Sequence, residues 1–404
     1  MKKRIGISIY PSKTGVKETI DYIKLAHKYG VRRVFANLLE INNTGKGIEK
    51  LGALKQTLTF ANKMGMEVIV DVSPTVYKSL GLEYTEYNFF KKVGATGIRL
   101  DEDFNGEVES ELSKNITVEL NASSGTTTMT KTIEKGGIAK NLIACHNFYP
   151  MEYTGLGIKN FINLSSEYKK MGTKVASFIT LPRNQEGVVG PWDVNDGIPT
   201  LEIHRGKTLS EQVRHYMAMD IVDDIIFSEQ GVTEEQFKVV QDLLFNSNFV
   251  LNKKSYEKLK VSKNQLNKYV ETSIGKNPTL IFEIEDMQKL TKVEKAILFN
   301  FPHNNRQDVN EYFIRSTYSR IIFKEEIIKP KKNDKEFFEP GDIVILNEKY
   351  NRYKGELHII TKRIPYTGKR NYVGKISLFD HNLLEFARPG RGFKIIKKGE
   401  KNVR

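Results

Sequence analysis

The chain has 404 residues, which is long for a single hydrophobic core, so two domains are expected. Hydrophobic residues make up 39% of it and charged residues 28%, a balance that excludes a wholly disordered chain. Cys145 is the only cysteine, so a disulfide framework is excluded and a reducing, cytoplasmic location is expected. No apolar run approaches the roughly 18 residues of a membrane span, and Ile5–Tyr10 is too short for a signal-peptide core.

The net charge of +14 is concentrated toward the C-terminal end, where residues 331–404 carry 18 Lys and Arg against 9 Asp and Glu. These basic residues are scattered, and no nucleic-acid-binding motif accompanies them. We therefore expect neither a nucleic-acid partner nor a membrane partner, whereas an anionic substrate fits the charge. These features do not determine the oligomeric state.

A repeated Lys-x-Gly element organises the first 245 residues. It follows a helix-like segment and precedes a strand-like one at Lys28–Gly30, Lys63–Gly65, Lys92–Gly94, Lys135–Gly137 and Lys170–Gly172. A left-handed glycine ends a helix, and lysine in the last turn is favoured by the helix dipole. Eight strand-like runs result: Arg4–Pro11, Val31–Leu39, Met66–Pro74, Thr96–Glu102, Ile116–Ser123, Asn141–Pro150, Lys174–Leu181 and Asp223–Glu229.

Eight strands alternating with helices over residues 1–245 predict a (β/α)8 TIM barrel as the catalytic domain. An open doubly wound sheet is the alternative. It usually has fewer strands, and the GxGxxG turn that would support dinucleotide binding is missing after the first strand.

Residues 246–404 are predicted to form a linker helix and a β domain. Lys253–Val270 is the candidate helix. Turn signals such as Pro340-Gly341 then separate short β runs, namely Thr279–Ile284, Ile314–Phe323, Asp342–Leu346, Glu356–Ile360 and Tyr372–Ile376. This pattern indicates a closed or half-closed β barrel.

The carboxyl ends of barrel strands, where TIM-barrel active sites lie, are rich in polar residues here. In chain order they offer Glu40, Asp71, Arg99, Asp101, Asn121, His146, Asn147, Tyr149, Thr154, Gly155, Glu202, His204, Arg205 and Glu229. Each has a structural alternative, such as a turn cap, an internal ion pair or a buried histidine. Together they indicate an enzyme site with carboxylates and hydrogen-bond donors. No HExxH or paired His–carboxylate spacing occurs, so we expect no metal and no cofactor.

Carboxylates, amides and arginine without a metal motif suggest glycoside or sugar-phosphate chemistry. Several longer motifs narrow this choice: Asp71–Ser73, Gly97–Asp101, His146–Pro150, Pro199–Arg205, Asn305-Arg306, Arg315-Ser316 with Arg320, Gly341–Ile345 and Arg352–Glu356. In these motifs the sequence resembles the bacterial 6-phospho-N-acetylmuramidase family over nearly its whole length. The resemblance implies a TIM barrel joined to a cyclophilin-like β domain. It also implies cytoplasmic hydrolysis of 6-phospho-N-acetylmuramyl-β-1,4-N-acetylglucosamine, a disaccharide recovered in peptidoglycan recycling.

Two loops depart from the family pattern. The family usually has Leu-x-Ile-Pro-Glu after the second strand, where this chain has Leu38–Asn42, and Gly-Asp after the eighth, where it has Ser228-Glu229. A different phosphorylated glycoside is therefore an alternative substrate. Two other functions stay open: a sugar-phosphate isomerase or aldolase, which would normally need a strand-end Schiff-base lysine or metal set, and a non-catalytic carbohydrate-binding protein.

We expect Asp101 and Glu202 to be the acid/base pair, with Asp71 in reserve. Arg99 would keep Asp101 ionised, while Glu202 would have a raised pKa. Arg205 would bind the phosphate, helped by a helix that opens at Thr154–Gly157. The remaining strand-end residues that we expect to contact substrate are Asn121, His146, Asn147, Tyr149 and His204.

The segment Arg352–Glu356 alternates Arg352, Lys354 and Glu356, which would share one face if it is extended. We expect Arg352 and Glu356 to reach the barrel mouth and contact the substrate. A surface hairpin with cross-strand ion pairs is the alternative.

Overall fold

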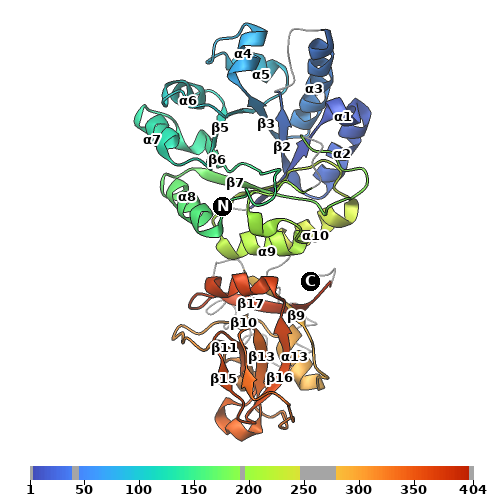
Figure 1. Ribbon diagram of the computed structural model, residues 1–404, viewed down its shortest axis with the longest axis vertical. Helices are drawn as coiled ribbons and strands as arrows, with labels where there is room; N and C mark the ends of the chain where they lie inside the picture. The colour runs from blue at the N-terminus through green and yellow to red at the C-terminus, as the bar shows by residue number, and fades with distance from the viewer. Residues whose placement is uncertain (1–2, 39–44, 192–195, 246–278, 400–404) are drawn as a thin grey trace. The chain divides into compact units, whose positions relative to one another are not determined.

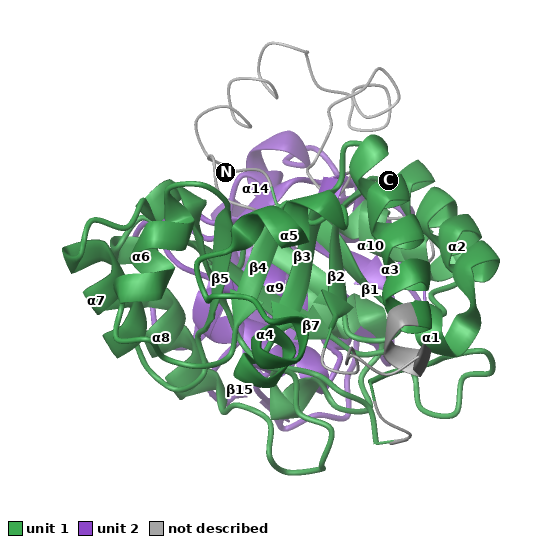
Figure 2. Ribbon diagram, turned by 90° about the horizontal axis from the view of Figure 1, so that it is seen from above, with its two compact units in different colours: residues 1–213, 221–244 green, residues 214–220, 245–404 purple. Residues whose placement is uncertain are grey.

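The computed structural model describes residues 3–38, 45–191, 196–245 and 279–399. The chain divides into two compact units, shown in green and purple in Figure 2. Unit 1 consists of residues 1–213 and 221–244, and unit 2 of residues 214–220 and 245–404. In the described ranges no helix combines the length and the apolar character needed to cross a bilayer.

Unit 1 is a closed barrel of eight parallel strands in sequence order, which confirms the predicted (β/α)8 fold. The strands are β1 (Arg4–Ile9), β2 (Val31–Asn37), β3 (Glu67–Val72), β4 (Gly97–Leu100), β5 (Thr117–Asn121), β6 (Leu142–Cys145), β7 (Lys174–Ile179) and β8 (Asp224–Phe227). Each predicted run contains one strand but extends beyond it, because polar residues such as His146–Pro150 leave the sheet for the following loop.

The helices of unit 1 surround the barrel strands (Figure 1). They are α1 (Pro11–Thr14), α2 (Val16–Lys28), α3 (Gly45–Lys63), α4 (Pro74–Leu80), α5 (Tyr87–Lys92), α6 (Glu107–Ser113), α7 (Thr127–Glu134), α8 (Ile158–Lys170), α9 (Leu209–Met219) and α10 (Glu234–Phe245), with 3-10 turns η1 (Ala139–Asn141) and η2 (Glu202–His204). Residues 214–219 of α9 belong to unit 2. Four predicted helix-ending glycines have positive φ, namely Gly30, Gly65, Gly94 and Gly172. In the remaining element, Lys135–Gly137, Gly136 with φ of 89° takes this role in place of Gly137.

Side chains inside the barrel form layers along the strands. Arg33 of β2 is fully buried and donates to Asp224 of β8 at 2.5 Å and to Glu119 of β5. Two residues further along their strands, Phe35 and Ile226 belong to a buried apolar cluster. Because side chains alternate along a strand, the next inward positions fall at the carboxyl ends. The carboxyl ends of the strands therefore lie beyond this apolar cluster, while Glu119 links the buried ion network to Arg99 of β4.

Unit 2 contains a seven-stranded mixed sheet with the order β10-β17-β9-β16-β13-β14-β11, and all neighbours are antiparallel except β17 and β9. Its strands are β9 (Leu280–Glu285), β10 (His303–Asn304), β11 (Phe313–Ser316), β13 (Asp342–Leu346), β14 (Leu357–Ile360), β16 (Arg370–Ile376) and β17 (Gly392–Lys397), with a separate pair β12 (Phe337–Phe338) and β15 (Ile364–Pro365). The helical segments are α13 (Lys292–Asn300), α14 (Ser319–Ile322), η4 (Glu348–Tyr353) and η5 (Phe379–Phe386). The N–H of Arg306, just after β10, donates to the carbonyl of Arg315 in β11 at 3.1 Å, so the sheet is nearly closed. The predicted β domain is thus confirmed.

Two predictions about unit 2 are wrong in detail. The run Ile314–Phe323 is a strand only to Ser316, because α14 follows. The segment from Arg352 to Glu356 is not extended, since Arg352 lies in η4 and Gly355 has φ of 90°. Alternate residues therefore do not share a face there. The candidate helix Lys253–Val270 lies outside the described residues, as does Glu40.

Candidate active site

Arg99 holds a group of polar side chains at the carboxyl ends of β3 to β6. Its Nε donates to Oδ1 of Asp101 at 2.9 Å, Nη1 donates to Oε1 of Glu119 at 3.3 Å, and Nη2 donates to Oδ1 of Asn147. Asp71 pairs with Arg99 in the β3–β4 register. Arg99 is only 4% exposed, so its planar fork is fixed by these partners. We name Asp71, Arg99, Asp101 and Asn147 the Arg99 cluster; all four were predicted site residues.

Asp71 is the member of the Arg99 cluster whose ionisation is most perturbed. Burial, together with the negative charge of Asp101, raises the pKa of its carboxyl to about 7, although the positive charge of Arg99 opposes both effects. Its Oδ1 has no hydrogen-bond partner among the described residues. A buried carboxyl group that holds its proton near neutral pH, with an oxygen not engaged by the protein, is suited to donating that proton.

Glu229, at the end of the β8 segment, is a second buried carboxyl group that the sequence interpretation noted without assigning a role. Burial raises its pKa to about 7. Its carboxylate accepts from Oγ1 of Thr180 and from the N–H of Leu181 at 3.1 Å, and its negative charge helps to raise the pKa of Tyr10. Because both oxygens of Glu229 accept hydrogen bonds from the β7 end, it is less free than Asp71 to act on a substrate.

Glu202 does not have the raised pKa that we expected. Its carboxylate accepts from Nε of Arg205 at 2.7 Å, from the N–H of Tyr153 at 2.9 Å and from the N–H of Gly155 at 2.8 Å. The Arg205 hydrogen bond is the main reason that its pKa falls to about 2, and it outweighs partial burial. Donors to the charged form stabilise that form, so Glu202 is ionised at neutral pH and is unsuited to general-acid catalysis.

Arg205 is bound to the protein on several sides. Its Nη1 donates to the carbonyl of Gly197 at 2.6 Å, and Nη2 donates to the carbonyls of Tyr149 and Met151 at 2.9 and 3.0 Å. Together with Glu202, these acceptors tie the loop after β7 to the loop after β6. Phosphate binding by Arg205 remains a prediction, and it would require the side chain to exchange some of these partners.

The segment Thr154–Gly157 leads into a helix only at its last residue, because Gly157 is the N-cap of α8, and Thr154 and Gly155 lie before the helix N-terminus where we expected a phosphate. Helix α8 begins at Ile158, and Leu156 forms a parallel bridge with Leu201 instead. The N–H of Gly155 is already donated to Glu202, and Oγ1 of Thr154 donates to the carbonyl of Met151 at 2.6 Å. A Cβ at Gly155 would lie 2.7 Å from the backbone nitrogen of Glu202, so this close approach requires glycine.

The two predicted histidines are buried, and His146 has a clear structural role. Its ring shares a hydrogen bond with Oγ of Ser165 at 2.9 Å, and burial, aided by the charge of Arg99, lowers its pKa to about 3. His204 lies buried in η2. Oδ1 of Asn121 accepts from the N–H of Ser123 at 2.9 Å. Tyr149, half-buried, donates its N–H to the carbonyl of Pro199 at 3.0 Å.

In unit 2 the two predicted contact residues differ in exposure. Arg352 is exposed on η4, whereas Glu356 is fully buried in an ion cluster. Among the residues that the structure describes, no three or more His, Cys, Asp and Glu side chains are grouped so that they could hold a metal ion.

Comparisons with known proteins cover both units. The family model described as "6-phospho-N-acetylmuramidase, N-terminal" matches residues 5–242, and the one described as "6-phospho-N-acetylmuramidase, C-terminal" matches residues 280–396. A search of curated proteins gives no significant match.

Two solved structures resemble the whole chain. One, an uncharacterized B. cereus protein, is 30% identical with a TM-score of 0.80, covering 98% of this chain and 100% of that chain. The other, a conserved Enterococcus faecalis protein with an unknown function, is 24% identical with a TM-score of 0.66, covering 98% and 97%. The second likeness shows the fold alone. Since the two family models together match most of its length, the chain belongs to the 6-phospho-N-acetylmuramidase family.

Proposed function

We propose that this protein is a cytoplasmic glycoside hydrolase that cleaves 6-phospho-N-acetylmuramyl-β-1,4-N-acetylglucosamine during cell-wall recycling. Membership of the family supports the substrate class, and the Arg99 cluster supports the reaction. Glycoside hydrolysis needs one carboxyl group that carries a proton and a second carboxyl group that is ionised. Two carboxyl groups suffice for this chemistry, so the proposal includes no metal ion.

The observation that carries the proposal is the contrast between Asp71 and Asp101. Asp71 has a pKa raised to about 7, whereas the carboxylate of Asp101 is ion-paired with Arg99 at 2.9 Å. In the proposed reaction Asp71 donates its proton to the glycosidic oxygen as the bond breaks. Asp101 acts at the anomeric carbon, either as nucleophile or as the base that activates water. Asp71 thus takes the acid role that we first expected for Glu202.

Arg99 is proposed to position both groups. It orients Asp101 by a direct hydrogen bond, and its positive charge keeps the pKa of Asp71 from rising further. The Arg99–Glu119 contact at 3.3 Å connects the cluster to the buried ion network of the barrel, in which Glu119 also accepts from Arg33. Asp71 and Arg99 thus lie on strands, which position side chains more accurately than loops do, whereas Asp101 follows β4 and is oriented by its hydrogen bond from Arg99.

The experiment is product analysis with the purified full-length protein. The phosphorylated disaccharide and its unphosphorylated form are incubated separately, and the products are identified by mass spectrometry. We expect cleavage of the phosphorylated form, with a loss of about 10³-fold or more in Asp71→Asn and in Asp101→Asn. Glu102→Gln is the matched control, because Glu102 is an exposed carboxylate next to Asp101. An inactive wild type, or an Asp71→Asn variant as active as the control, would refute the proposal.

A further inference from the structure

Unit 2 contains an arginine cluster built around one buried carboxylate. Glu356 is fully buried and accepts from Nε and Nη2 of Arg315 at 2.9 and 3.1 Å, from Nη1 of Arg320 at 2.6 Å, and shares a contact of 3.1 Å with Nε2 of His358. Burial lowers the pKa of His358 to about 4, so this histidine is neutral at physiological pH. Two guanidinium groups therefore share one carboxylate, which leaves a net positive charge.

The two arginines are held by Glu356 but are not buried with it. Their side chains are 23% and 20% exposed, whereas the Glu356 side chain is 0% exposed. Within the described residues, Nη1 of Arg315 and Nε and Nη2 of Arg320 have no protein acceptor. These N–H groups are available to a ligand in solution.

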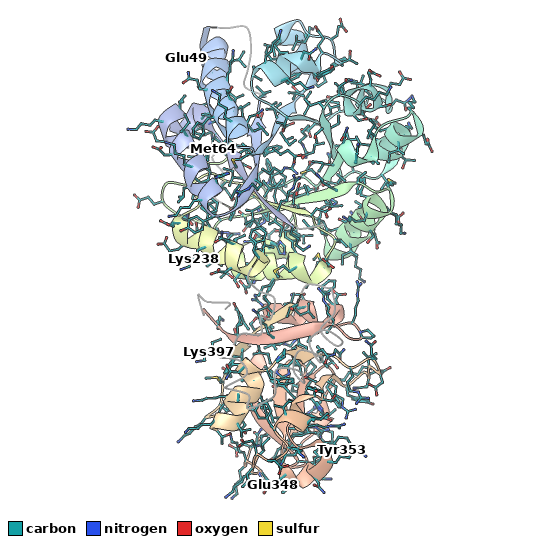
Figure 3. All side chains as sticks on the ribbon, turned by 180° about the vertical axis from the view of Figure 1, so that it is seen from behind. Glu49, Met64, Lys238, Glu348, Tyr353 and Lys397 are labelled. Atoms are coloured by element: carbon teal, nitrogen blue, oxygen red, sulfur yellow. The ribbon has the colours of Figure 1, made fainter. Side chains whose placement is uncertain are left out.

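The backbone and the neighbouring side chains fix Arg320 in place. Oγ of Ser319 donates to the carbonyl of Gly355 at 2.6 Å, and a Cβ at Gly355 would lie 3.3 Å from Cα of Arg320. The ring of Tyr353 lies 5.7 Å from the guanidinium carbon of Arg315 and 5.4 Å from that of Arg320. Figure 3 shows Tyr353 and Glu348, both on η4, at the end of unit 2 opposite Lys397 of β17.

The surroundings do not cancel the positive charge. The nearby Arg306 is paired with Asp308 at 2.5 Å, which makes that pair neutral overall. The sequence around Tyr353 adds the basic residues Lys349, Arg352 and Lys354 on η4 and at its end, against one acidic residue of η4, Glu348. An anion that approaches this surface meets guanidinium groups whose orientation is already fixed, so little ordering cost remains.

We propose that Arg315 and Arg320 form an anion-binding site of unit 2 that takes a phosphate monoester, with Glu356 as the buried group that positions them. The planar forks of arginine match the oxygens of a phosphate, and one dianion would compensate the excess positive charge. This assigns Glu356 a positioning role in place of the direct substrate contact expected from the sequence. The site does not depend on the chemistry proposed for the barrel.

A structural ion cluster alone would not need this arrangement. A single arginine bidentate to Glu356 already satisfies the buried carboxylate, since charged pairs need only matched hydrogen bonds. The second arginine adds charge and open donors at the surface. Arg320 can therefore be changed while Arg315 still pairs with Glu356, which makes a clean test possible.

The test is isothermal titration calorimetry on the full chain with glucose 6-phosphate, inorganic phosphate and acetate. We expect saturable binding of the two phosphates, weaker binding at high salt, and little binding of acetate. Arg320→Gln should weaken phosphate binding by about tenfold or more, as expected for losing charge-assisted hydrogen bonds. The control Arg363→Gln removes an exposed arginine paired with Glu339 and should leave binding unchanged.

Comparing the ligands and the variants shows which kind of anion binds and whether the site exists. Tighter binding of glucose 6-phosphate than of phosphate indicates a phosphorylated sugar as ligand, and equal binding indicates free phosphate. If Arg320→Gln does not fold, Arg320→Lys decides, because it keeps the charge but loses the fork and should weaken binding less. Binding that is absent in the wild type, or identical in the Arg320 and Arg363 variants, overturns the site. Asp71→Asn should keep this binding while losing hydrolysis, so failure of one proposal is distinguishable from failure of the other.

Discussion

Replacing Asp71 by Asn should stabilise the protein at high pH and change its stability little at low pH. The ordinary pKa of an aspartate is 3.8, and burial with the charge of Asp101 raises that of Asp71 to about 7 in the folded protein. Between these two pKa values only the folded protein holds the proton. The stability of the wild type is therefore greatest below about pH 4 and falls as the pH rises from about 4 to about 7. The wild type therefore loses stability across this window, whereas an asparagine, neutral at every pH, does not.

The size of the effect follows from the same values. A difference of about three pKa units, at about 1.4 kcal/mol each, gives about 4 kcal/mol as an upper bound above pH 7. Asparagine is nearly the same size as aspartate, and Oδ1 of Asp71 has no hydrogen bond to lose among the described residues. The bound is reduced if Arg99 moves closer to the ionised carboxylate in the wild type.

The assay is urea unfolding at pH 4 and pH 8, followed by circular dichroism. We expect equal midpoints at pH 4 and a higher midpoint for Asp71→Asn at pH 8. Glu102→Gln, which removes an exposed carboxylate nearby, should show no such pH-dependent difference. The reasoning is refuted if Asp71→Asn differs from the wild type by the same amount at both pH values, or if it is less stable at pH 8.

Three further predictions concern residues other than Asp71, the proposed proton donor. Glu202→Gln should lower the free energy of unfolding by about 1.5–3 kcal/mol, because it weakens the charge-assisted hydrogen bonds of that carboxylate. Gly155→Ala should lower it by about 1–3 kcal/mol by crowding the same carboxylate. A thermal midpoint unchanged in both variants would contradict the role of Glu202 in tying the two loops together. Arg205→Lys should reduce kcat/KM more on phosphorylated than on unphosphorylated substrate if Arg205 binds the phosphate, and steady-state kinetics showing equal losses would make it structural.

The barrel was predictable because its signal is local and repeated. Five helices end at a Lys-x-Gly element, and the strands are largely apolar runs, so the count of eight follows from the sequence pattern. The exception in the element Lys135–Gly137 is also local, since Gly136 and Gly137 are adjacent and either can adopt positive φ.

The roles of the carboxyl groups were harder to predict because pKa values depend on contacts between distant residues. Asp71 obtains its raised pKa from burial and from Asp101, which the β3–β4 pairing brings near. Glu202 was misjudged chiefly because Arg205, three positions later, donates to its carboxylate, whereas we had assigned Arg205 to the phosphate. Its two backbone donors lie 47 and 49 positions earlier in the chain and add to the same effect. In unit 2, Arg315 and Glu356 are 41 positions apart and meet because β11 pairs with β14.

The most direct test of the central claim changes the leaving group. The disaccharide needs a proton on its departing oxygen, whereas a 4-nitrophenyl glycoside of the same phosphorylated sugar releases a stable anion and needs none. We predict that Asp71→Asn loses about 10³-fold in kcat/KM on the disaccharide but recovers most of that loss on the nitrophenyl substrate, while Asp101→Asn is impaired on both. Equal losses on the two substrates in Asp71→Asn would contradict its role as the acid.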